Sequence, residues 1–326
     1  MGRGRGYATF ARERLSGWTR GFDSPILSPM SGLSVDILIV TWNRKNDLIR
    51  TLASIQSQSL QPGRVIVVDN GSEDGTREII PTEFPEIEFL GQDSNLGACG
   101  GRNIGMRSVR GELVFFMDDD TELLPGCLEE IVKRFEGDPG LGAVQPTILL
   151  PHQDIEVEVD SSLKPNPHPI SAAWCVRREA LPVDPWPEHF SRQGEEMWVA
   201  MHLYKRGYES EIWPPAKCLH HQAPGGQREK IFFFFTRNSF LLYYQRFPLL
   251  LALAMVPYKL LRTLINVRSL KELQSWINGF ASGLKMILSG KAKRDSIGWA
   301  GAIRYLQAVR SSRDAERVTS RAPDPI

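Results

Sequence analysis

A run of five apolar residues that ends in three aspartates constrains this chain more than any other feature. Leu113–Met117 has the composition of a buried strand, and Asp118, Asp119 and Asp120 follow it directly. Crowded carboxylates repel one another, so the cluster needs counter-charge or water, and a divalent cation carrying an anionic ligand is the strongest counter-charge available. The alternative interpretation of these three acids alone is a solvated turn.

Strands and helices alternate along the chain and predict an α/β fold with a doubly wound, mostly parallel sheet. Polar residues follow three of the expected strands, and the carboxyl ends of neighbouring parallel strands lie along one edge of such a sheet. Asp69 is suited to accept hydrogen bonds from a base or ribose, and Asp118 and Asp120 to hold a metal that bridges two phosphates. The expected strands are Val35–Val40, Arg64–Val68, Ile87–Leu90, Leu113–Met117 and Gly142–Pro146, and the expected helices are Asp47–Ser57, Asn103–Val109, Leu128–Phe135 and Glu195–Arg206.

Charge is unevenly distributed, although the 326-residue chain has a formal net charge of only +1. Residues 34–258 carry 21 Lys and Arg against 31 Asp and Glu, whereas residues 259–326 carry 13 against 5. We expect a loose basic N-terminal arm over 1–33, a catalytic domain over 34–225 and a helical, basic C-terminal region over 226–326. The basic end suits an anionic membrane surface better than nucleic acid, because no nucleic-acid recognition module accompanies it.

Several features predict a cytoplasmic protein with peripheral contact to the inner face of a membrane. The four cysteines are widely spaced and form no Cys-x-x-Cys motif, which favours a reducing compartment. No continuous apolar N-terminal segment marks a signal peptide. The apolar run Phe247–Tyr258 is too short to span a bilayer. It is either a buried helix or an interfacial helix flanked by Lys259, Arg262 and Arg268.

The segment from Val35 to Ile80 resembles the nucleotide-binding half of family 2 glycosyltransferases. Ser94–Met106, with the sequence SNLGACGGRNIGM, is similar to the rhamnosyltransferase-like branch of that family, and Asp118–Asp120 matches its D-x-D metal motif. The resemblance extends from about Leu33 to His221 with the motifs in the family order. It implies a GT-A fold with a C-terminal helical extension. It also implies an inverting transfer of a hexosyl or rhamnosyl group from a UDP- or dTDP-linked sugar to a hydroxyl of a glycan or lipid-linked acceptor.

The resemblance also implies roles for individual residues. It places Asp118 and Asp119 in the nucleotide-binding motif and assigns the metal, Mg²⁺ or Mn²⁺, to Asp120, Asp118 and His220, with His221 as the second choice of histidine. The remaining residues that it assigns to the nucleoside, diphosphate or donor sugar are Thr41, Asn43, Arg44, Asp69, Asn95, Arg102 and Asn103.

An inverting transfer needs a carboxylate that takes the proton of the acceptor hydroxyl. The family places this base in an acidic pair that opens a helix, which corresponds here to Glu195 and Glu196. The second acid usually serves as the base and points to Glu196, but the family more often has Asp there, which leaves the choice open. Two solvated acids in a first helical turn, favourable to the helix dipole, are the alternative interpretation.

Two other functions fit part of the pattern. Phosphatases of the haloacid dehalogenase type also place Asp-x-Asp after an apolar strand, but they need Thr or Val where Glu122 stands and carry the motif early in the chain. The other is a non-catalytic nucleotide-sugar-binding protein. It is disfavoured because every expected carboxylate is present.

Overall fold

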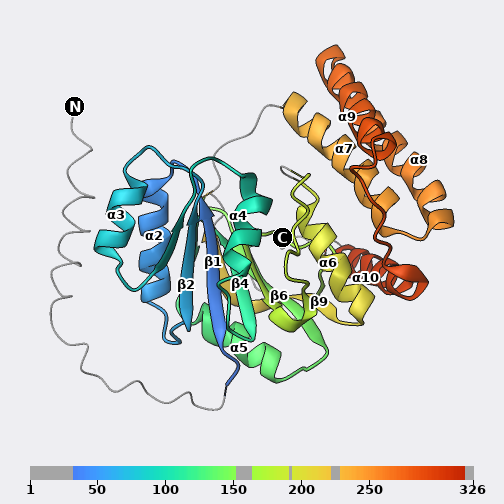
Figure 1. Ribbon diagram of the computed structural model, residues 1–326. Helices are drawn as coiled ribbons and strands as arrows, with labels where there is room; N and C mark the ends of the chain where they lie inside the picture. The colour runs from blue at the N-terminus through green and yellow to red at the C-terminus, as the bar shows by residue number, and fades with distance from the viewer. Residues whose placement is uncertain (1–31, 152–163, 191–192, 222–227, 320–326) are drawn as a thin grey trace, which may run out of the picture. The chain divides into compact units, whose positions relative to one another are not determined.

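The computed structural model describes residues 32–151, 164–190, 193–221 and 228–319. The expected N-terminal arm over 1–33 lies outside the described residues except for its last two. In the described part of the chain, one mixed sheet of nine strands forms the centre of the fold (Figure 1). Its strands are β1 (Val35–Thr41), β2 (Arg64–Asp69), β3 (Glu88–Gly91), β4 (Leu113–Asp118), β5 (Thr121–Leu123), β6 (Leu141–Leu149), β7 (Lys164–Pro165), β8 (Ala173–Arg177) and β9 (Glu209–His220).

The order of the strands reverses between β1 and β4. β1 pairs in parallel with β2 on one side and with β4 on the other, and β3 continues the parallel sheet beyond β2. Beyond β4 the sheet is mixed, because β8 runs antiparallel to β4 and β6, and β5 runs antiparallel to β9. The predicted doubly wound, mostly parallel sheet is confirmed. The pairing of β5 was not foreseen, since a three-residue strand has no periodic pattern.

Helices cover both faces of the sheet, as Figure 1 shows for α2 and α3 on one side and α4 and α6 on the other. Their cores follow from the alternation of side chains along a strand. Ile37 and Ile39 of β1 pack in one core with residues of α2 and α5, whereas Leu38 packs in the other core with residues of α4 and α6. The helices are α2 (Lys45–Gln56), α3 (Thr76–Glu83), α4 (Gly97–Met106), α5 (Cys127–Glu136), α6 (Glu195–Arg206), α7 (Arg228–Arg246), α8 (Leu249–Ile265), α9 (Leu270–Leu288) and α10 (Gly298–Thr319).

Helix α4 begins six residues earlier than expected from the sequence, at Gly97 instead of Asn103. The glycine-rich segment, which has the composition of a loop, is part of this helix. Its glycines allow the helix to pack closely on the sheet. A Cβ on Gly101 would lie 2.7 Å from Cγ1 of Val40, and one on Gly105 would lie 2.1 Å from Cδ1 of Leu38. Because these two glycines have no side chain, α4 can lie close to β1.

The C-terminal helices form the expected helical extension. Helix α7 packs against α8 and α9, and α10 packs against α6. The apolar run Phe247–Tyr258 is buried only in part. Phe247 and Ala252 lie in the core with residues of α6, whereas Leu250 and Leu253 are exposed. Among the described residues, no helix is both long and apolar enough to cross a membrane.

We expect Gly105→Ala to destabilise the fold by about 1–3 kcal/mol, because the new methyl group would overlap Leu38 and force the core to shift. Urea unfolding followed by circular dichroism measures the loss. Gly137→Ala is the matched control, since its Cβ would lie 3.5 Å from the backbone carbonyl oxygen of Lys133, which is an ordinary contact. Equal midpoints for the two variants would contradict the close approach of α4.

Candidate functional site

The first group of predicted residues lies at the carboxyl ends of β1, β2 and β4. The strand register pairs Thr41 with Asp69 and Val40 with Asp118, so these ends lie at one edge of the sheet. This edge is also the point where the strand order reverses. Ligands of open α/β sheets bind at such a position.

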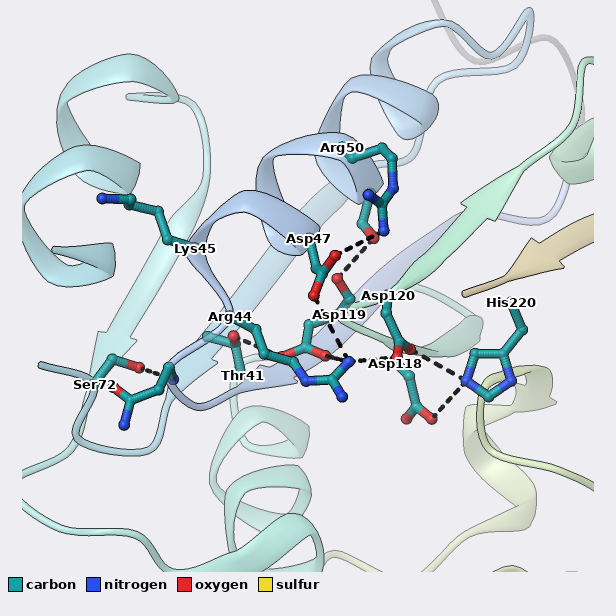
Figure 2. Close-up of polar contacts among 12 residues, drawn as sticks. Thr41, Arg44, Lys45, Asp47, Arg50, Ser72, Asp118, Asp119, Asp120 and His220 are labelled. Carbon is teal, nitrogen blue, oxygen red and sulfur yellow. Dashed lines mark hydrogen bonds and ion pairs between the residues drawn. The ribbon is translucent and has the colours of Figure 1, made fainter. Parts of the chain in front are cut away.

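The three aspartates point to different partners (Figure 2). Asp119 turns back to β1 and accepts a hydrogen bond of 2.7 Å from Oγ1 of Thr41. Asp118 and Asp120 face His220, whose Nε2 lies 3.9 Å from Oδ2 of Asp118 and 3.2 Å from Oδ1 of Asp120. One ligand atom from each of these three residues lies within 4.8 Å of the others.

His220 reaches the aspartates because β5 pairs with β9. Thr121 lies opposite His220 in this antiparallel register, and the backbone N–H of His221 donates to the carbonyl of Asp120 at 2.9 Å. The side chain of His221 lies apart from the cluster, with Nε2 2.7 Å from Oε1 of Glu122. The geometry therefore brings His220, and not His221, to the aspartates.

Arg44 follows β1 and supplies positive charge beside the aspartates. Its Nη1 bonds to Oδ2 of Asp120 and lies 3.7 Å from Oδ1 of Asp119 (Figure 2). Burial alone would raise the pKa of Asp120, but the hydrogen bonds from His220 and Arg44 hold it below its usual value. Burial raises the pKa of Asp119 to about 7, although Thr41 and Arg44 oppose the shift.

A chain of hydrogen bonds connects this cluster to the acidic pair on α6. Nη2 of Arg102 lies 3.0 Å from Oδ1 of Asp118 and donates to Oγ of Ser171 at 2.9 Å. Oγ of Ser171 donates in turn to Oε1 of Glu196 at 2.9 Å. The guanidinium of Arg102 also lies 4.6 Å from the ring centre of Trp186. Glu196 and the aspartates therefore belong to one polar network.

The two acids of the pair have different surroundings. Glu195 is buried, and burial together with the nearby charge of Glu196 raises the pKa of Glu195 to about 8. Glu196 is half-buried and is fixed by Ser171. At neutral pH, Glu195 is largely protonated.

Asn43 and Asp69 form the turns beside β1 and β2. Asn43 adopts a left-handed backbone with φ of 55°, and its Oδ1 accepts from the N–H of Glu73 at 2.7 Å. Asp69 is fully buried, with Oδ2 3.1 Å from Nε of Arg77 and both oxygens accepting from the N–H of Ser72. Their side chains stabilise the loops of this edge.

The two predicted asparagines on or near α4 also hold local structure. Asn95 is exposed, and its Oδ1 accepts from the N–H of Gly97 at 2.8 Å. Asn103 is buried and bonds through both ends of its amide to the backbone of Trp186, at 2.9 and 3.0 Å, and to Glu188 at 3.2 Å. Asn103 therefore anchors the segment around Trp186 rather than facing the aspartates.

Sequence reasoning missed two residues at the site. Ser171 lies in a Pro-rich segment with no motif, so no local signal identifies it. Trp42 does have a signal, because it stands between Thr41 and Asn43 in the polar loop after β1. It is 52% exposed, which is unusual for a large aromatic side chain and leaves its ring available for stacking.

Comparison with known proteins identifies the first part of the described chain. Residues 36–152 match the family model described as "Glycosyl transferase family 2". The chain carries a glycosyltransferase family 2 domain. The domain is 32% identical over 104 residues to the GalNAc(5)-diNAcBac-PP-undecaprenol beta-1,3-glucosyltransferase of Campylobacter jejuni, which covers 31% of this chain and 34% of that protein. It is also 32% identical over 108 residues to the glycosyltransferase AglE of Haloferax volcanii, over 32% of this chain and 36% of that protein. The chain thus spans little more than a third of these relatives.

Solved structures show that the fold extends beyond the family 2 domain. S. aureus TarS 1–349 has a TM-score of 0.58 at 15% identity, over 88% of this chain and 92% of that chain. GalNAc-T7, solved with UDP, GalNAc and Mn²⁺, has a TM-score of 0.61 at 13% identity, over 91% of this chain and 59% of that chain. The chain has the GT-A fold of these structures.

As pH rises from about 4.5 to about 8, we expect the free energy of unfolding of the wild type to fall relative to that of the Glu195→Gln variant. The pKa of Glu195 is raised in the folded state, so in this window the folded protein binds a proton that the unfolded chain has lost. Raising pH therefore favours unfolding, and glutamine removes this titration. Melting temperatures measured across the window give the difference.

The control is Glu83→Gln, a change at an exposed carboxylate on α3. Its melting temperature should stay at a constant offset from that of the wild type. A constant offset for Glu195→Gln as well would show that Glu195 ionises as it does in the unfolded chain.

Proposed function

We propose that the protein is an inverting glycosyltransferase. It moves a sugar from a nucleotide-diphosphate sugar to a hydroxyl of a glycan or lipid-linked acceptor. The observation that carries this proposal is the meeting of Asp118, Asp120 and His220 at the strand-order reversal of a family 2 domain. The hydrogen-bonded connection to Glu196 adds a carboxylate that suits a general base.

The donor atoms of Asp118, Asp120 and His220 fit a divalent metal. Two carboxylates suit Mg²⁺ or Mn²⁺, and an imidazole is a reasonable third ligand for Mn²⁺. When bound, the ion would supply positive charge to the departing diphosphate. GalNAc-T7 was solved with Mn²⁺ and UDP on the same fold, which supports this choice of ion and nucleotide class.

Glu196 is the better of the two candidates for the base. A base must be ionised before the reaction, and the raised pKa of Glu195 keeps that residue largely protonated at neutral pH. Glu196 would take the proton of the acceptor hydroxyl while the hydroxyl oxygen attacks the anomeric carbon. The bond from that carbon to the diphosphate breaks on the opposite side, which inverts the configuration. Ser171 would hold Glu196 in place through its hydrogen bond.

The nucleoside would lie over the loops after β1 and β2, near Thr41, Asn43, Arg44 and Asp69. The exposed ring of Trp42 would stack on the base or ribose. The ion pair with Asp118 would keep the positive charge of Arg102 near the diphosphate. The donor nucleotide is UDP or dTDP, and the transferred sugar is a hexose, with rhamnose suggested by the Ser94–Met106 resemblance.

The acceptor is proposed to be lipid-linked or part of a cell-envelope glycan. A related enzyme of Campylobacter jejuni is named for an undecaprenol-linked acceptor, which supports a lipid-linked substrate. We therefore propose a cytoplasmic protein that works at the inner face of a membrane. The phosphatase alternative is not favoured, because Glu122 stands where those enzymes need Thr or Val. Oε1 of Glu122 lies 2.7 Å from Nε of Arg50 and 2.7 Å from Nε2 of His221.

A thermal-shift screen of nucleotide sugars, with and without Mn²⁺, tests the donor. A ligand at 100 times its Kd stabilises the folded state by about 2.7 kcal/mol, so the correct donor raises the melting temperature. We expect Mn²⁺ to increase the shift with UDP- or dTDP-sugars and Asp120→Asn to remove that increase. Equal shifts with and without Mn²⁺ for every donor would contradict the metal site.

Transfer assays with the purified donor test the two carboxylates. We expect Asp120→Ala to abolish transfer and Glu196→Gln to reduce kcat by at least about 100-fold, because a general base contributes about 10²–10⁴-fold. Glu196→Gln should still bind the nucleotide. The control Glu129→Gln changes a partly exposed carboxylate on α5 and should retain full activity. Retained turnover in both site variants would remove the proposed site.

A further inference from the structure

A cavity lies beside α8, on the side of this helix that faces the rest of the protein. Its volume is about 390 Å³, which is within the range of pockets for small ligands. The α8 residues in its wall recur at helical spacing and share one face, opposite the exposed leucines of the helix: Lys259, Arg262, Thr263 and Asn266. The opposite wall comes from α7, from α10 and from the segment after β7.

Three cations line this cavity, and no carboxylate lines it among the side chains that the structure describes. Lys259 and Arg262 come from α8, and Arg313 comes from α10. The sequence has no Asp or Glu between Glu229 and Glu272, so α8 itself cannot supply a counter-charge. The cavity therefore concentrates positive charge and suits an anionic ligand.

Two polar residues of the wall are already bonded. Oγ1 of Thr263 donates to the carbonyl of Leu260 at 2.8 Å and accepts from Nε1 of Trp276 at 2.7 Å. Nδ2 of Asn266 donates to the carbonyl of Arg262 at 2.8 Å. Recognition of an anion therefore depends on the three cations and on the donors of the opposite wall.

The opposite wall contains two neutral donors. Burial, together with the charges of Lys259 and Arg313, lowers the pKa of His168 to about 4, so its ring is neutral near pH 7 and offers one N–H. Ser312 of α10 adds a hydroxyl group. Guanidinium and ammonium groups combined with neutral donors match the oxygens of a phosphate or diphosphate.

A short stretch of chain connects the cavity to the proposed base. His168 lies in the cavity wall and precedes Ser171 by three residues. The Cα atoms of these two residues therefore lie at most about 11 Å apart. Ser171 in turn donates to Glu196 at 2.9 Å. A ligand in the cavity is thus close to the carboxylate that would activate the acceptor.

Helix α7 makes a second connection to the same helix. Phe235 lies in the cavity wall, and Asn238, three residues later on α7, donates from Nδ2 to the carbonyl of Gln193 at 2.8 Å. Gln193 stands two residues before the start of α6 at Glu195. Helix α10 also packs on α6 (Figure 1). The cavity therefore lies on the α6 side of the site, where the acceptor hydroxyl would meet its base.

We propose that this cavity binds the phosphate or diphosphate of the acceptor, so that the enzyme glycosylates a phosphorylated saccharide. Lys259, Arg262 and Arg313 would hold the phosphate oxygens while a hydroxyl farther along the saccharide reaches Glu196. The diphosphate of the donor has its own place beside Asp118, so the two anionic groups do not compete. The inference deepens the proposed function and rests on it for the acceptor reaction, whereas anion binding by the cavity needs no catalysis.

Calorimetric titration with inorganic pyrophosphate, in a metal-free buffer, tests the cavity by itself. We expect saturable binding by the wild type and a Kd about 100-fold higher for Arg262→Gln/Arg313→Gln, because each lost charge-assisted hydrogen bond is worth roughly tenfold. Both side chains are exposed, so the variant should keep the melting temperature of the unliganded wild type.

The matched control is Lys271→Gln/Lys285→Gln, which removes two exposed charges from α9 outside the cavity. It should bind pyrophosphate like the wild type, and any binding at the edge of the sheet should be the same in all three proteins. Equal pyrophosphate affinity of the wild type and Arg262→Gln/Arg313→Gln would overturn the cavity as an anion site.

Transfer assays then compare a saccharide diphosphate with the same saccharide without phosphate as acceptors. The wild type and the α9 control should have the higher kcat/KM with the phosphorylated acceptor. In Arg262→Gln/Arg313→Gln, the ratio of the two kcat/KM values should fall by a factor close to the loss of pyrophosphate affinity. An unchanged ratio in this variant would overturn the acceptor as the ligand of the cavity.

Other sources of the phosphate give different results. Lost pyrophosphate affinity with an unchanged acceptor ratio would show that a free phosphate compound is the ligand. Flotation with phosphatidylglycerol vesicles that only Arg262→Gln/Arg313→Gln loses, again with an unchanged ratio, would show a lipid headgroup. Either result would overturn the acceptor assignment.

The two proposals can fail separately. Pyrophosphate binding by the cavity without transfer to either saccharide would contradict the proposed function, and with it the acceptor reaction. Transfer to both saccharides with equal kcat/KM would contradict the role of the cavity alone.

Discussion

The mutual repulsion of carboxylates at the edge of the sheet is the constraint on which the site depends. Asp118, Asp119 and Asp120 stand in sequence, and three cationic or titratable groups from distant parts of the chain balance them. Arg44 comes from the loop after β1, Arg102 from α4 and His220 from the end of β9. The charge cluster is therefore stable only when the sheet is complete.

The neighbouring groups also give the acidic residues of the site different hydrogen bonds and different burial. Asp119 turns to Thr41 and becomes part of the buried structure, whereas Asp118 and Asp120 keep oxygens that face His220. On α6, burial separates Glu195 from Glu196 in the same way. In both clusters, side chains of the same type differ in their hydrogen bonds and burial because of their surroundings.

Much of the fold and part of the site follow from local sequence. Apolar runs predicted the central strands, and Glu195–Arg206 was predicted with both ends correct. The family resemblance predicted that Asp118, Asp120 and His220 lie together. In the structure, Asp118 and His220 end strands β4 and β9, and Asp120 lies in the turn between β4 and β5. Local patterns do not predict contacts between distant parts of the chain. The pairing of β5 with β9, the hydrogen bond of Asp119 with Thr41 and the hydrogen bond of Ser171 with Glu196 are contacts of this kind. The early start of α4 could not be predicted, because glycine is a poor helix former. Glycine is required at these positions by the close packing of α4 on β1.

The origin of His220 in β9 has a consequence for how such proteins diversify. The family match ends at residue 152, whereas Ser171, Glu196 and His220 all come later in the chain. The two halves of the polar network are thus consecutive blocks of sequence that meet only in space. An exchange of sequence by recombination near β6 would therefore replace Ser171, Glu196 and His220 together and leave Asp118, Asp120 and the loops after β1 and β2 unchanged.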